Sequence, residues 1–115
     1  MRNEVRLQVR QAREALAALH PGLFDLTHPK PFAIGISAQL TALYPEMPKR
    51  TISGLLGWLT CRRAYLLACK PGAPRYALSG DPAGVVSDAE AQYAACRFIE
   101  RDARAVDKWA GRVAA

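Results

Sequence analysis

Cationic side chains are concentrated between Met47 and Gly80, a stretch that contains no aspartate or glutamate. All ten acidic residues of the chain lie outside it, so no carboxylate within the stretch neutralises its charge. Such a surface attracts a polyanion, and the planar guanidinium of arginine is well suited to phosphate oxygens. The pattern predicts nucleic-acid binding. The residues concerned are Lys49, Arg50, Arg62, Arg63, Lys70 and Arg75, with the aromatic rings of Tyr65 and Tyr76 among them.

Length and composition indicate one small domain. The chain has 115 residues, half of them hydrophobic, and a formal charge of +6. No apolar run approaches the roughly 20 residues of a membrane helix, and the charged N-terminus is unlike a signal peptide, so a cytoplasmic location is expected. The three cysteines (Cys61, Cys69, Cys96) form no CxxC pair. We therefore expect neither a disulfide framework nor a zinc site, and no metal or cofactor.

Hydrophobic periodicity predicts a helix from the N-terminus to about His20, which Pro21-Gly22 would end. Leu23-Phe24 would then enter the core. The apolar face of this helix would consist of Val5, Val9, Ala12, Leu16 and Leu19, beside a basic stripe of Arg2, Arg6, Arg10 and Arg13.

Further along, we expect a short helix to about Tyr44, a helix beginning near Pro48 and a helical segment from about Arg62 to Cys69. Residues 75–78 and 84–86 would pair as a small β-hairpin. Ser87 and Glu90 form a capping-box pattern that opens the last helix. Its apolar side would use Ala91, Ala95, Phe98, Val106, Trp109 and Val113, and its basic side Arg97, Arg101, Arg104, Lys108 and Arg112.

Three segments, in this order and spacing, resemble the ProQ/FinO family of bacterial RNA chaperones. They are residues 30–36 (KPFAIGI), then Thr60 with Tyr65-Leu66, then residues 70–84 (KPGAPRYALSGDPAG). The resemblance covers about residues 12–100 and implies a single FinO-like domain, mainly α with a small β-hairpin (α+β) and about five helices. It also implies binding of structured RNA, at the base of a hairpin followed by a single-stranded 3′ tail, in regulation by small RNAs.

The resemblance also suggests site residues. Lys49 matches a family lysine at the start of a helix that contacts duplex RNA, and Tyr65 and Arg75 match residues that line the pocket for the RNA 3′ end. Lys30 falls at a basic position and Lys70 belongs to the shared turn. At four positions where relatives often carry a basic residue, this chain has Ala33, Ser53, Gly57 and Ala64; Arg50, Arg62 and Arg63 are candidates to compensate.

Each candidate has a structural alternative. Tyr65 can offer its ring and hydroxyl to RNA or be a core tyrosine, and Arg75 can clamp a phosphate from its proline-stiffened turn or be solvated. Lys49 and Arg50 fit duplex phosphates at a helix N-terminus or only aid solubility. Of Arg62 and Arg63, neighbours on a helix, only one is expected to contact RNA.

Two other classes of function compete with RNA binding. An enzyme is disfavoured because His20 and His28 lack a carboxylate or cysteine partner at a suggestive spacing, and no phosphate-binding glycine pattern is present. A generic polyanion-binding, DNA-architectural or protein-interaction module remains the alternative. No obligate protein partner is evident, and a monomer is expected.

Overall fold

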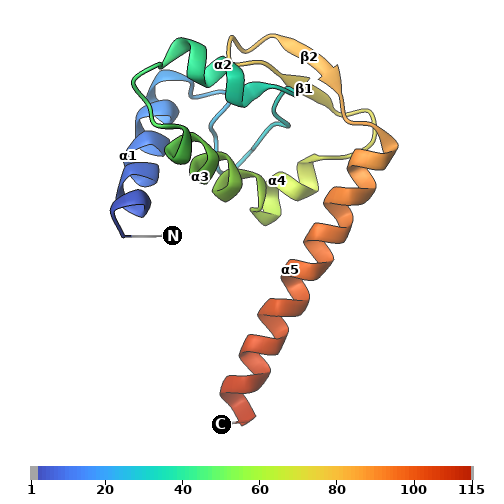
Figure 1. Ribbon diagram of the computed structural model, residues 1–115. Coiled ribbons are helices and arrows are strands. Elements are labelled where there is room, and N and C mark those ends of the chain that lie inside the picture. Colours follow the sequence, from blue (N-terminus) through green and yellow to red (C-terminus); the bar gives the residue numbers. More distant parts are fainter. Residues whose placement is uncertain (1–2, 115) are drawn as a thin grey trace.

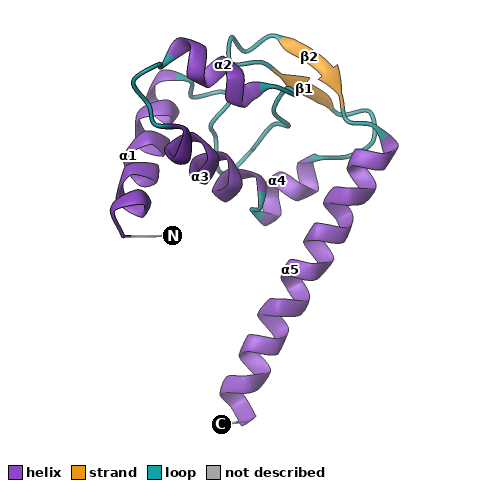
Figure 2. Ribbon diagram, viewed as in Figure 1, coloured by secondary structure: helices purple, strands orange, loops and turns teal. Residues whose placement is uncertain are grey.

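The computed structural model describes the backbone of residues 3–114 and the side chains of residues 3–104. Within these residues the chain forms five helices and one antiparallel hairpin (Figure 1, Figure 2). The mainly helical fold expected from the sequence is confirmed. The predictions for Arg2, Val106, Lys108, Trp109, Arg112 and Val113 concern side chains outside the described residues. In order, the elements are α1 (Asn3–Leu19), α2 (Ile36–Leu43), α3 (Lys49–Thr60), α4 (Arg63–Ala68), β1 (Pro74–Tyr76), β2 (Pro82–Val85) and α5 (Asp88–Ala114).

Helix α3 lies at the centre of the core and packs against α1 and α2, and Leu78 and Val86, which flank the hairpin strands, belong to the same buried cluster. Helix α1 buries Val9 and Leu16 against this core, as its apolar spacing predicts. Leu19 was wrongly assigned to the buried face: it is 62% exposed, because α1 ends there and the following turn brings Leu23 and Phe24 into the core instead. Helix α3 supplies its own buried stripe of Ile52, Leu55 and Leu59.

The hairpin is tied to a segment that precedes α2. Strand β1 pairs with β2 in the register Pro74–Val85 and Tyr76–Pro82, so the second strand begins at Pro82 and not at Gly84 as expected. On the other side of β1, the Ala33 amide donates to the Tyr76 carbonyl at 2.8 Å. The Tyr76 amide donates to the Pro31 carbonyl at 2.9 Å. The segment around Phe32 is therefore fixed beside the strand.

Helix α5 starts next to the hairpin and α4 and then extends away from the rest of the domain (Figure 1). The predicted capping box is present, since the Ser87 amide donates to Glu90 Oε1 at 2.8 Å and the Glu90 amide donates to Ser87 Oγ at 3.1 Å. Ala91 is buried as expected, but Ala94 and not Ala95 is its buried neighbour, because the contact face follows steps of three. No helix among the described residues is long and apolar enough to cross a membrane.

Candidate nucleic-acid interface

Tyr65 and Arg75 line the same cavity. It has a volume of about 440 Å³ and is enclosed by the end of α3, by α4, by β1 and by the first turns of α5. Tyr65 lies in the first turn of α4, and Arg75 lies in β1. The fold thus brings together the two side chains that the resemblance assigned to one pocket.

Both side chains bind the backbone of Phe32. The Phe32 amide donates to the Tyr65 hydroxyl at 3.0 Å, and Nη1 of Arg75 donates to the Phe32 carbonyl at 2.8 Å. The Tyr65 ring packs on the Phe32 ring with centroids 5.3 Å apart, and Tyr65 is only 7% exposed. Burial raises the pKa of the Tyr65 phenol, so it stays neutral at physiological pH. Tyr65 is therefore a wall of the cavity and not an open stacking surface.

Arg75 is not an uncompensated cation, contrary to the sequence-based expectation. Its Nη2 lies 3.0 Å from Glu90 Oε2. The carboxylate comes from α5, outside the stretch that lacks acidic residues, so counting charges along the chain missed the pair. Nε of Arg75 is buried and has no hydrogen-bond partner among the described residues. A buried donor without a hydrogen-bond partner is energetically unfavourable.

Helix α5 brings two further side chains to the cavity. Tyr93 and Arg97 follow Glu90 by three and seven residues, and both line the cavity. Tyr93 is 67% exposed, so its ring is open at the rim. Arg97 Nη2 donates to Cys61 Sγ at 3.3 Å, and this hydrogen bond raises the pKa of its guanidinium. Tyr93 is not among the site residues predicted from the sequence. The signal that could have found it is its spacing of three residues from Glu90, which places both side chains on the same face of a helix.

Arg62 and Arg63 point to different neighbours, as expected for adjacent residues at the start of a helix. The guanidinium carbon of Arg62 lies 4.7 Å from the centroid of the Trp58 ring on α3. Arg63 turns to α5, where its Nε lies 3.5 Å from Asp102 Oδ1 and its guanidinium carbon 5.3 Å from the Phe98 ring centroid. Arg63 is thus a second cation that α5 neutralises.

Lys49 and Arg50 are exposed at the N-terminus of α3. Pro48 precedes them and makes no side-chain cap, and the first turn of the helix contains no acidic residue. Two cations at the positive end of a helix dipole are poorly placed unless an anion binds there. They lie about 17 Å along the helix from the α4 end, at 1.5 Å per residue, so they belong to a separate part of the surface.

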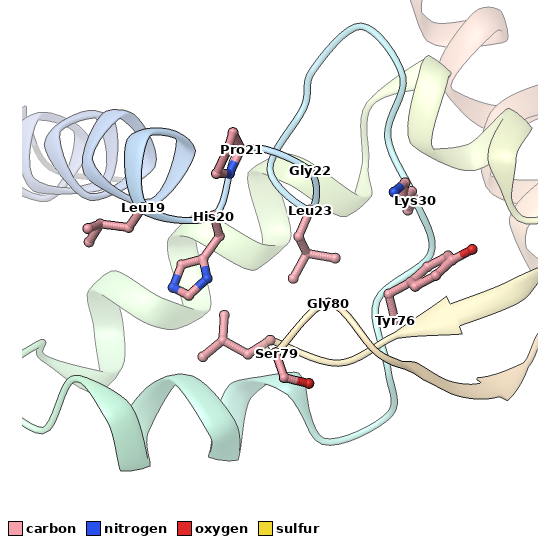
Figure 3. Close-up of a pocket in the computed structure, with 10 residues that line it drawn as sticks. Leu19, His20, Pro21, Gly22, Leu23, Lys30, Tyr76, Ser79 and Gly80 are labelled. Carbon is pink, nitrogen blue, oxygen red and sulfur yellow. The ribbon is translucent and has the colours of Figure 1, made fainter.

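Lys30 and Lys70 lie outside the cavity that Tyr65 and Arg75 share. Lys30 borders a second cavity of about 370 Å³, between the end of α1 and the hairpin turn (Figure 3). Its ammonium lies 5.0 Å from the centroid of the Tyr76 ring. Lys70 is exposed on the turn before β1, which is held by a hydrogen bond of 2.8 Å from the Gly72 amide to the Val86 carbonyl.

The sequence profile of the ProQ/FinO family matches residues 7–110. The chain belongs to the ProQ/FinO family. Two curated relatives, each named RNA chaperone ProQ, from Histophilus somni strains 2336 and 129Pt, are 30% identical over 97 residues. The match covers 81% of this chain and 46% of each relative, so the chain spans about half their length.

Two solved structures of ProQ/FinO proteins have the same fold. The solution structure of a ProQ homologue from Legionella pneumophila superimposes with a TM-score of 0.68 at 27% identity, covering 82% of both chains. The crystal structure of a FinO-like RNA chaperone from Neisseria meningitidis MC58 gives a TM-score of 0.68 at 24% identity, over 78% of this chain and 73% of that one. These similarities confirm the fold class predicted from the sequence.

The positions at which this ProQ/FinO domain departs from the resemblance fall in different environments. Ser53 and Gly57 are exposed on α3, whereas Ala64 is half-buried and Ala33 is buried. A Cβ added at Gly57 would meet no heavy atom within 4 Å. At these two exposed positions α3 therefore carries no cationic side chain.

Proposed function

We propose that this domain is an RNA-binding chaperone that holds the base of a hairpin together with its single-stranded 3′ end. The main support is the shared cavity, which Arg75, Arg97 and the exposed Tyr93 all line. A 3′ end presents phosphates, hydroxyls and an unstacked base, which match guanidinium donors and an aromatic rim.

The duplex part would contact the cations at the start of α3. Lys49 and Arg50 lie beside the first amides of this helix, a combination suited to backbone phosphates. A-form RNA conceals its major groove, so recognition would depend on shape, phosphates and 2′-hydroxyls. We further propose that the domain acts as a cytoplasmic monomer without a cofactor, in regulation by small RNAs. The names of its relatives as RNA chaperones support the RNA part of this proposal.

Competition binding tests the proposal. The probe is an RNA hairpin with a 3′ uridine tail, and the competitors are the same hairpin with a 3′ phosphate and a double-stranded DNA of equal length. The tailed hairpin should bind best. With four to six phosphates neutralised, the logarithm of affinity should fall against the logarithm of salt with a slope of about −3 to −5. Equal affinity for all three nucleic acids would instead indicate a generic polyanion binder.

A matched pair of variants on α5 locates the site. Arg97→Gln removes a cation that lines the cavity, whereas Arg104→Gln removes an exposed cation farther along the same helix. The first change should weaken binding of the free 3′ end and reduce the preference over the 3′ phosphate. The second should leave that preference unchanged. If both variants behave alike, the cavity does not hold the 3′ end.

A further inference from the structure

Two arginines share one tryptophan ring on the α1–α3 side of the domain. The guanidinium carbon of Arg13 lies 4.2 Å from the centroid of the Trp58 ring, and that of Arg62 lies 4.7 Å from it. The three residues come from α1, from α3 and from the position before α4. We call this group the arginine–tryptophan stack. None of its members lines the cavity of Tyr65 and Arg75.

The charges of the stack are not balanced within the described part of the chain. There, neither Arg13 nor Arg62 takes part in an ion pair, whereas Arg10 is 3.9 Å from Glu14 and both Arg63 and Arg75 pair with α5. Each guanidinium is attracted to the indole face, but the two repel one another. An anion bound at the edges of the two guanidiniums would offset this repulsion.

Stacking leaves the edges of both guanidiniums able to donate hydrogen bonds. A guanidinium over a ring uses its face, and its N–H groups lie in its own plane. The ring also restricts the side-chain rotamers, so less entropy is lost when a phosphate binds. Since both groups contact one ring, they are close enough to engage neighbouring phosphates of one strand.

The surface next to the stack is open. Trp58 itself is 37% exposed, and the adjacent Gly57 carries no side chain and has free space around it. A nucleic-acid backbone can therefore approach α3 closely here. Lys49 and Arg50 lie at the other end of the same helix. At about 100° per residue, Arg50 lies about 80° from Trp58 around the helix axis, whereas Lys49 lies on the opposite side. A duplex lying along the Trp58 side of α3 would therefore meet Arg50 first and the stack about two helical turns later.

We propose that Arg13 and Arg62 form a second phosphate-binding site, for the double-stranded part of the RNA, and that Trp58 is a positioning residue that holds both guanidiniums. This inference rests on the proposed function. Through Arg13, helix α1 would then belong to the RNA-contacting surface. The two arginines would supply positive charge that α3 lacks at Ser53 and Gly57.

The test measures affinity for the tailed hairpin and for the same hairpin with a 3′ phosphate, over a range of salt. Arg13→Gln should weaken both by the same factor, roughly fivefold, and make the salt slope shallower by about 1. The matched control is Arg10→Gln, the same charge change one turn earlier on α1, with an expected effect below about twofold.

Trp58→Leu separates a positioned site from charge alone. It removes no charge, yet it should weaken both probes about threefold, because the guanidiniums lose the ring that orients them; Trp58→Phe should recover part of the loss. Circular dichroism verifies that the variants are folded. If Trp58→Leu does not fold, the comparison of Arg13→Gln with Arg10→Gln still tests the stack proposal. If wild-type protein prefers the RNA hairpin to DNA but Arg13→Gln equals Arg10→Gln, only the stack proposal is overturned. If wild-type protein shows no such preference, the proposed function itself fails, and the stack proposal with it.

Discussion

Glu90 holds the guanidinium of Arg75 through a contact of 3.0 Å between Oε2 and Nη2. The carboxylate therefore lies in the cavity proposed for the RNA 3′ end, where it repels phosphate and occupies one of the donors that a phosphate would use. The same side chain also caps α5 through the Ser87 amide. Glu90 thus has two roles that can be separated, since a glutamine can cap a helix but carries no charge.

Glu90→Gln should increase the affinity for a tailed RNA hairpin by about two- to fivefold, the range of an exposed ion pair. The reason is that Arg75 is released while the cap is kept. Fluorescence anisotropy would measure the change. Asp88→Asn is the control, because it removes the same charge from the first turn of α5 outside the cavity. Weaker binding by Glu90→Gln would mean that the carboxylate orients Arg75 and does not compete with RNA.

The stability of the domain should depend on Glu90 at acid pH. Hydrogen bonds with Ser87, and then the charge of Arg75, lower the pKa of the Glu90 carboxyl in the folded state. A carboxyl with a lowered pKa contributes stability above its unfolded pKa, about 4.3, and this contribution is lost as the pH falls through the folded value. Urea unfolding between pH 7 and pH 3 should show a shallower acid loss for Glu90→Gln than for the wild type. Parallel curves would exclude this linkage.

Tyr65→Phe should lower the free energy of unfolding by about 1–3 kcal/mol, the penalty for leaving a buried donor unpaired. The variant keeps the ring on Phe32 but removes the acceptor of the Phe32 amide. Denaturant unfolding measures the loss. Tyr93→Phe, at an exposed ring of the same cavity, should change stability very little. A full Tyr65→Ala or Arg75→Ala change would remove bonds to Phe32 as well as any RNA contact, so it cannot separate the two effects.

Gly57→Ala should stabilise the domain by about 0.5–1 kcal/mol, because glycine is a poor helix former. The position is exposed in α3, and an added Cβ meets nothing within 4 Å. Gly35→Ala provides the opposite case. Space is also free there, but φ is 89°, a conformation that alanine adopts only with strain. Thermal unfolding should therefore show opposite shifts for the two variants.

Local patterns predicted most of the fold. The apolar spacing placed the helices within a few residues, and the Ser87–Glu90 pattern located the start of α5. Bounds were less certain where two signals compete, as at Pro82, which suits a turn by residue type but lies in an edge strand. Edge strands tolerate proline because its missing N–H faces away from the ladder.

The charge balance of the candidate site could not be predicted in the same way. It depends on how α5 docks, since that helix brings Glu90 to Arg75 and Asp102 to Arg63. The window from Met47 to Gly80 contains neither carboxylate. Tertiary packing likewise places Lys30 beside Tyr76 at a different cavity from that of Arg75, and gives Arg62 its ring partner on α3.

The docking of α5 has a thermodynamic consequence for ligand affinity. One wall of the cavity belongs to a helix whose described contacts with the domain lie in its N-terminal half, among them those of Ala89 and Asp102. Partial undocking of this helix would remove that wall of the cavity while the core between α1 and α3 stayed folded. Any ligand that needs the complete cavity must therefore favour the docked state of α5. By reciprocity, an interaction that stabilises the docked helix increases the affinity for that ligand.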